Sequence, residues 1–190
     1  MRLSLVPFLI AGLLAGCATQ SSIKPSESLD ERTGVTVGAL QEPIEFVETF
    51  QTPVAGNGKR TSFAYLGPVE WDRSGDITYG LWVHVAPGSD RQVGDIRSQG
   101  AVTLILDDGP VVLSPMEAPN VGSGPYKPIA SWGQTQYFGL DVAMLKRLAG
   151  SEKLSLSFRG VDQSNVDFAP MHETRATLQK FTQARGITDD

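Results

Sequence analysis

Two histidines, His84 and His172, are the only imidazoles that the chain offers for acid–base chemistry. Nucleophilic catalysis needs a serine, threonine or cysteine beside such a base, and no serine stands in the G-x-S-x-G pattern of a nucleophile elbow. His84 lies in an expected strand over 78–85, on the same side as Trp82, which favours a strand residue packed beside that indole. His172 directly precedes Glu173, and adjacent helical residues do not share a face. The sequence therefore predicts no catalytic residue and no enzyme.

Metal and nucleotide sites are not indicated either. Zinc sites need several His or Cys ligands at characteristic spacings, and neither H-E-x-x-H nor paired C-x-x-C occurs in the sequence. Asp107-Asp108-Gly109 lacks the alternating oxygen ligands and the final Glu of a calcium loop, so a turn is sufficient to explain it. The Gly-rich patterns that hold nucleotide phosphates are also absent from the sequence. We expect no metal and no cofactor.

Three carboxylates, Glu70, Asp72 and Asp76, fall close together in the sequence. Paired carboxylates hydrolyse glycosides when they are held about 5 to 9.5 Å apart. Spacing along the chain does not determine that gap, and a solvated turn is the simpler explanation. A hydrolase is accordingly the least favoured of three functional hypotheses.

The aromatic residues include candidates for a ring-stacking surface for sugars or peptides, because such side chains combine apolar area with a polar group. Core packing is the default interpretation for most of them. Trp132 differs because it adjoins a stretch over 114–127 that is rich in Pro, Gly and Asn and is expected to be a long loop, as is the stretch around 56–58. We predict a ligand-binding surface at Trp132, Tyr126 and Asn120. The alternative is that both loops only connect strands.

The first seventeen residues have the layout of a cleaved signal peptide. Arg2 supplies a positive start, residues 3–14 are largely apolar, and two small residues precede Cys17. An apolar run of about 12 residues is too short to cross a bilayer core, which requires about 20. Leu14-Ala15-Gly16-Cys17 resembles the lipobox of bacterial lipoproteins, and the resemblance implies a diacylglycerol thioether on Cys17 with cleavage before it. A secretory signal with an incidental cysteine and a buried N-terminal helix are the weaker alternatives.

Lipid on Cys17 is the membrane attachment that the resemblance implies. Cys17 is the only cysteine in the chain, and two or three acyl chains give stable anchoring. Ala18 rather than Asp follows it, which by resemblance to Gram-negative sorting patterns favours the outer membrane, facing the periplasm. Residues 17–34 are mostly polar and are expected to form a flexible tether. The predicted organisation is a cleaved signal over 1–16, a lipidated tether over 17–34 and one domain over 35–190.

Short apolar runs separated by turn residues predict a mainly β domain after the tether. Eight such strands favour an antiparallel β-sandwich or a barrel-like sheet. One short inserted helix is expected over 141–149, capped by Asp141, and a C-terminal helix over 171–185 that stops at Gly186. No domain family is recognised from these features. The expected strands are 35–40, 44–50, 62–71, 77–85, 101–106, 111–114, 129–138 and 154–159. The strand over 101–106 is apolar at nearly every position, as in a strand covered on both faces, and a hairpin turn over 107–110 is expected to join it to the next strand.

The formal net charge of −5 at pH 7 gives nucleic-acid binding no electrostatic basis. Membrane attachment is therefore assigned to the lipid on Cys17 and not to surface charge. The favoured hypothesis is a non-catalytic envelope lipoprotein whose domain binds an envelope protein or a polymer such as peptidoglycan in the periplasm. A module that binds small ligands or carbohydrates is the alternative.

Overall fold

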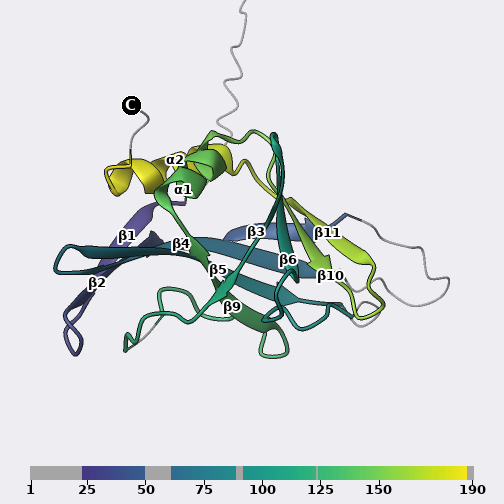
Figure 1. Cartoon of the computed structure of the whole chain (residues 1–190), viewed down its shortest axis with the longest axis horizontal. Helices are drawn as coiled ribbons and strands as arrows, with labels where there is room; N and C mark the ends of the chain where they lie inside the picture. The colour runs from purple at the N-terminus through teal and green to yellow at the C-terminus, as the bar shows by residue number, and fades with distance from the viewer. Residues whose placement is uncertain (1–22, 50–60, 89–91, 123, 188–190) are drawn as a thin grey trace, which may run out of the picture.

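A computed structural model describes residues 23–49, 61–88, 92–122 and 124–187 of the chain. The expected signal peptide, Cys17 and the loop around 56–58 lie outside these described residues. Within them, eleven strands form one antiparallel sheet and two helices pack against it (Figure 1). The fold is mainly β, as predicted. In chain order the elements are β1 (Pro25–Asp30), β2 (Val35–Leu40), β3 (Ile44–Glu48), β4 (Phe63–Arg73), β5 (Asp76–Ala86), β6 (Val102–Leu106), β7 (Gly109–Val112), β8 (Pro115–Met116), β9 (Gln134–Leu140), α1 (Val142–Gly150), β10 (Ser155–Arg159), β11 (Asn165–Pro170) and α2 (Arg175–Ala184).

The sheet curls until its two ends meet in one continuous stretch of chain. Its hydrogen-bonded order is β7-β6-β10-β11-β3-β4-β5-β9-β8, and only Leu113 and Ser114 separate the end strands β7 and β8. The Leu113 amide donates to the Val102 carbonyl, and the Ser114 carbonyl accepts from the Gly139 amide. The described strands therefore close a barrel-like ring in which β7 and β8 act as one strand. Of the two predicted architectures, the barrel-like one fits this connectivity.

The inside of the ring is apolar. Alternate residues of each strand point inward because successive side chains of a strand face opposite sides. Phe158 of β10 and Phe168 of β11 pack edge to face there, with ring centroids 5.2 Å apart. Burial of a side chain of this size contributes about 1.5 to 3 kcal/mol. Fully buried residues of this interior include Phe46, Leu66, Val83, Leu104, Phe138, Leu156, Phe158 and Phe168.

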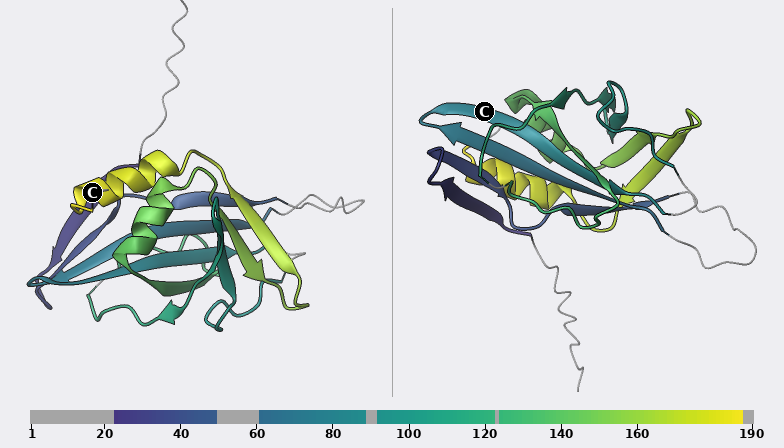
Figure 2. Two further views of the ribbon diagram at one scale, coloured as in Figure 1. Left: turned by 45° about the horizontal axis from the view of Figure 1, so that its top comes forward. Right: turned by 90° about the horizontal axis from the view of Figure 1, so that it is seen from below.

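The β1–β2 hairpin extends the sheet beyond the ring. The first half of the long strand β4 pairs with β3 and its second half pairs with β2. Helix α2 lies on one side of this extension, with Leu178 and Phe181 buried, and α1 packs against α2. Both helices therefore cover the same side of the molecule, as Figure 2 shows in its left view.

The prediction of a flexible tether over 17–34 is wrong for the part of this segment that the structure describes. Residues Pro25–Asp30 form β1, which pairs with β2 from Pro25 opposite Leu40 to Asp30 opposite Val35. The segment contains no buried residue, and its polar sequence gives no strand signal of its own. It is ordered by its neighbour, because an edge strand needs only one hydrogen-bonded partner. The domain therefore begins before residue 35.

Most predicted strands are present, with some corrections. Strand β2 has the predicted bounds, whereas β9 begins at Gln134 and not at 129, because a turn occupies 130–133. The strand expected over 101–106 was interpreted as covered on both faces, but Ile105 is 38% exposed. Strand β11 was not predicted, although Val166 and Phe168 alternate there with exposed residues.

Both predicted helices are present. Asp141 caps α1, because its carboxylate accepts a hydrogen bond from the Met144 amide at 2.7 Å. Helix α2 starts at Arg175, four residues later than expected, and ends before Gly186, whose φ of +68° suits a helix terminator. The predicted hairpin at 107–110 joins β6 to β7 as expected.

Candidate functional site

One outer face of the barrel, over β4, β5 and β9, is covered by the long connection between β8 and β9. Two glycines make room for its aromatic residues and for a tryptophan of the sheet. A β-carbon at Gly67 would overlap the Tyr126 ring, and one at Gly80 would come within 2.7 Å of Trp71. Trp82 lies directly opposite Gly67 on β5, with its ring centroid 5.2 Å from that of Tyr126. The connection is therefore packed onto the sheet and forms part of the fold.

Tyr126 is a buried anchor of this connection. Its hydroxyl donates to the Pro68 carbonyl and accepts from the Leu40 amide, each at 2.9 Å. Burial raises the pKa of this phenol well above its ordinary value. Only 6% of the residue is exposed, so its ring offers no surface to a ligand. Tyr126 was predicted to share a binding surface with Trp132, and the structure does not bring the two rings together at an exposed surface.

His84 is the second anchor, and it packs beside Trp82 as predicted. The two rings are stacked with centroids 5.7 Å apart. Nε2 of His84 accepts from the Ala130 amide at 3.3 Å, so the ring proton is assigned to Nδ1, which donates to Thr135 Oγ1 at 2.8 Å. The residue is fully buried, and burial lowers the pKa of its imidazole. Both nitrogens are occupied by structural hydrogen bonds, which leaves neither placed to activate a nucleophile.

The turn over 130–133 rests on His84 and presents Trp132 to solvent. Its two ends are joined by a hydrogen bond from the Gly133 amide to the Ala130 carbonyl, at 3.1 Å. A β-carbon at Gly133 would overlap the His84 ring, so the glycine permits this close approach. Trp132 is 73% exposed, and Ile129 beside the turn is 58% exposed. The prediction that Trp132 lies near the surface is confirmed.

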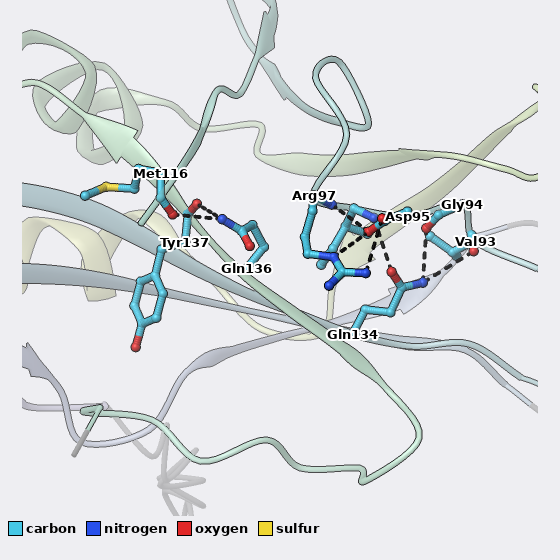
Figure 3. Close-up of polar contacts among 9 residues, drawn as sticks. Val93, Gly94, Asp95, Arg97, Met116, Gln134, Gln136 and Tyr137 are labelled. Carbon is cyan, nitrogen blue, oxygen red and sulfur yellow. Dashed lines mark hydrogen bonds and ion pairs between the residues drawn. The ribbon is translucent and has the colours of Figure 1, made fainter. Parts of the chain in front are cut away.

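The polar residues that follow Trp132 are used inside the fold. The amide of Gln134 donates to the Gly94 carbonyl at 3.0 Å and accepts from the Ile96 amide at 3.2 Å. The amide of Gln136 donates to the Met116 carbonyl at 2.8 Å. Figure 3 shows these side chains reaching from β9 to the segments on either side. They fix β9 beside the turn and contribute little to an exposed surface.

Asn120, the third predicted ligand-binding residue, is exposed. The neighbouring Gly122 amide donates to the Asp30 carboxylate at 2.5 Å, which ties this stretch to the β1–β2 hairpin. That bond and one from Thr33 hold the pKa of Asp30 below its ordinary value. Asn120 therefore lies in a part of the connection that is held by Asp30, whereas the Trp132 turn is held by His84. Of the three predicted residues, Trp132 and Asn120 are exposed.

Three of the carboxylates considered for catalysis or metal binding have structural partners. Asp72 accepts from the Gly75 amide in the β4–β5 turn. Asp107 accepts from the amides of residues 152 and 153, which supports its interpretation as a turn residue. Glu70 contacts Arg185, which also pairs with Glu27. Among the described residues no group of three or more His, Cys, Asp or Glu is arranged to hold a metal ion.

Two features of the structure were missed by sequence reasoning. Ile129 was assigned to a strand, although the Ser-Trp-Gly sequence after it was a usable turn signal. The Arg185 ion pairs had no local signal, because the three partners lie far apart in the sequence.

No helix in the described ranges is long and apolar enough to cross a bilayer. No family model, curated protein or solved structure matches the chain.

Proposed function

We propose that this chain is a lipid-anchored protein of the bacterial envelope whose barrel-like domain recognises a protein or polymer partner through the surface at Trp132. The anchor is lipid on Cys17, in the outer membrane, with the domain in the periplasm. The lipobox resemblance of residues 14–17 supports this anchor. The exposure of Trp132 is the observation that carries the recognition function.

An exposed indole on a firmly held turn is a costly feature for folding alone. Leaving 73% of Trp132 in water forgoes on the order of 4 kcal/mol of hydrophobic burial. Tryptophan is enriched among the residues that dominate binding energy at protein interfaces. The anchors at Tyr126 and His84 hold the turn in place before a partner arrives, which lowers the ordering cost of binding. Ile129 adds a second apolar contact at the same place.

A carbohydrate ligand is the second candidate, and the flat exposed face of Trp132 is the observation that favours it. Sugar sites combine such a ring with polar side chains that bond the hydroxyl groups. The exposed residues that precede Trp132 in the sequence are Lys127, Pro128, Ile129 and Ser131, of which two are apolar. This mixture favours a protein contact over a sugar contact.

The experiment uses the lipidated full chain in cells that are crosslinked before lysis. Trp132→Ala is compared with Val161→Ala, which truncates another exposed apolar residue, 59% exposed, on the β10–β11 turn. We expect Trp132→Ala to reduce the amount of captured partner at least tenfold and Val161→Ala to leave that amount unchanged. Equal capture by both variants would show that Trp132 is not the recognition surface.

Two further measurements separate the remaining parts of the proposal. Sedimentation with purified peptidoglycan, lost in Trp132→Ala, identifies a polymer partner, and a Trp132-dependent protein crosslink identifies a protein. Cys17→Ser is expected to move the folded chain from the membrane fraction to the soluble fraction. Retention of that variant in the membrane fraction would overturn the anchor.

A further inference from the structure

We infer that the layer formed by α1 and α2 is the membrane-facing surface of the domain and lies against phospholipid head groups, while the Trp132 turn points away from the bilayer. The inference rests on the proposed lipidation of Cys17. It adds an orientation and a second interaction surface to the proposed function.

The first observation is the short length of chain between the lipid and the fold. Only five residues separate Cys17 from Ile23, so the span cannot exceed about 20 Å even when it is fully extended. Ile23 is half-buried and packs against the core, and the Lys24 carbonyl accepts from the Gln41 amide at 2.8 Å. The fold therefore begins at the start of β1, and the domain cannot move far from the lipid on Cys17.

The second observation is where this attachment lies. Strand β1 contacts α2, and Arg185 at the end of α2 bonds Glu27 of β1 at 2.7 Å. The views in Figures 1 and 2 agree in placing the start of β1 beside α2. A lipid attached through so short a link brings this side of the domain closest to the bilayer.

The third observation is the charge of the two helices. The chain carries a net charge of −5, yet α1 and α2 contain no Asp or Glu. Their basic residues are Lys146, Arg147, Arg175 and Lys180, with Arg185 directly after α2. The three arginines pair with acids of neighbouring segments, whereas Lys146 and Lys180 form no ion pair with any described residue. Lysines of this kind are attracted to phosphate groups at an anionic bilayer surface.

Three of the described acids beside this layer have partners within the fold. Asp141 caps α1, Glu152 pairs with Arg175, and Glu173 accepts from the Ala176 amide at the start of α2. Two apolar residues of this layer are exposed, namely Val142 at the start of α1 at 42% and Met171, four residues before α2, at 46%. A surface that combines exposed apolar side chains with lysines suits the boundary between head groups and acyl chains. A weak contact is sufficient here, because a short tether gives the surface an effective concentration of about millimolar or higher.

The fourth observation places the recognition turn on the other side. Helix α2 packs on the sheet face that carries Gly38 and Glu70, since Arg185 lies over the first and bonds the second. Tyr126 packs on Gly67, an odd-numbered position of β4, and Glu70 is an even-numbered one, so the two face opposite sides. The surface at Trp132 is thereby available to a partner located beyond the membrane surface.

The test uses the lipidated full chain in phosphatidylcholine vesicles that contain phosphatidylglycerol and nitroxide-labelled lipid. A fluorophore is attached at Gln183→Cys on α2 or, as the matched control, at Ser131→Cys in the Trp132 turn, both of which replace exposed residues. Cys17 is the only native cysteine and is blocked by lipid, so each probe labels one site. We expect at least twofold stronger quenching at position 183 than at position 131. Equal or reversed quenching would overturn the orientation.

Charge reversal gives a second readout on the same protein. Lys146→Glu combined with Lys180→Glu is expected to reduce quenching at position 183 while the chain still floats with the vesicles. Unchanged quenching would show that the lysines do not face the head groups. A wild-type chain that fails to float indicates failure of the proposed anchor, whereas a chain that floats with equal quenching at both positions contradicts only the orientation.

Discussion

The guanidinium of Arg185 lies over Gly38, in the space where any other residue would place its β-carbon. A β-carbon built at Gly38 would stand 2.5 Å from Nη1 of Arg185. Gly38 is paired with Glu27 on one neighbouring strand and with Glu70 on the other, and both carboxylates bond Nη1, at 2.7 and 3.3 Å. The missing side chain of Gly38 thus makes room for a cation between two acids, and it joins α2 to β1 and β4.

Gly38→Ala is expected to destabilise the domain by about 2 kcal/mol, because the displaced guanidinium leaves the nearly buried Glu70 without its ionic partner. The measurement is urea unfolding of the soluble domain. In an Arg185→Ala background the same substitution should cost at least about 1 kcal/mol less, since no guanidinium remains to be displaced. Gly139→Ala is the control, because a β-carbon there meets only Met116 Sδ, at 3.9 Å. Equal costs in both backgrounds would exclude the proposed contact.

The sequence was sufficient to predict the elements whose own residues carry the signal, such as apolar alternation or a capping residue. Strand β2 and helix α1 were predicted within a residue of their bounds, because apolar alternation and the Asp141 cap are local signals. The polar strand β1 was taken for a tether, since its order comes from pairing with β2. An edge strand exposed on most sides needs no apolar residue, and composition therefore does not reveal it.

The candidate site was predictable only in part, for a related reason. Trp132 was placed at the surface by its Gly- and Pro-rich surroundings, and the same argument misplaced Tyr126. The difference between them is the tertiary contact of Tyr126 with Gly67, 59 positions earlier in the chain. Arg185, Glu27 and Glu70 also meet only in three dimensions, and no spacing in the sequence predicts their contact.

Alkaline solution should destabilise the domain through its tyrosines. All four have raised pKa values, and burial is the leading cause in each case. For Tyr79 burial and then the charge of Glu70 raise the pKa to about 12. The folded state keeps protons that the unfolded state loses above about pH 10, so stability falls as pH rises from that value. Absorbance at 295 nm should show less tyrosinate at pH 11 in the native domain than in guanidinium, where ionisation is nearly complete.

Mild acid should destabilise the domain through His84. Burial lowers the pKa of this imidazole, so below about pH 6.5 the unfolded state binds a proton that the folded state does not. Stability is therefore complete above that pH and declines as the pH falls below it. Thr135→Val should cost about 1 to 3 kcal/mol at pH 7.5, because Nδ1 of His84 loses its buried partner, and Thr135→Ser should restore most of the loss. A wild-type unfolding midpoint that is unchanged between pH 7.5 and 5.5 would contradict this account.

Trp132 should dominate the response of the protein to collisional quenchers. The chain contains three tryptophans, of which Trp71 and Trp82 are 2% and 1% exposed. Acrylamide or iodide at low concentration should therefore quench one population in the folded domain, and Trp132→Phe should remove it. Because Trp132 makes little buried contact, that substitution should change the free energy of unfolding by no more than about 0.5 kcal/mol. Persistence of the quenchable population in Trp132→Phe would mean that Trp71 or Trp82 reaches solvent. The Trp132 turn would then not be the exposed aromatic surface of the domain.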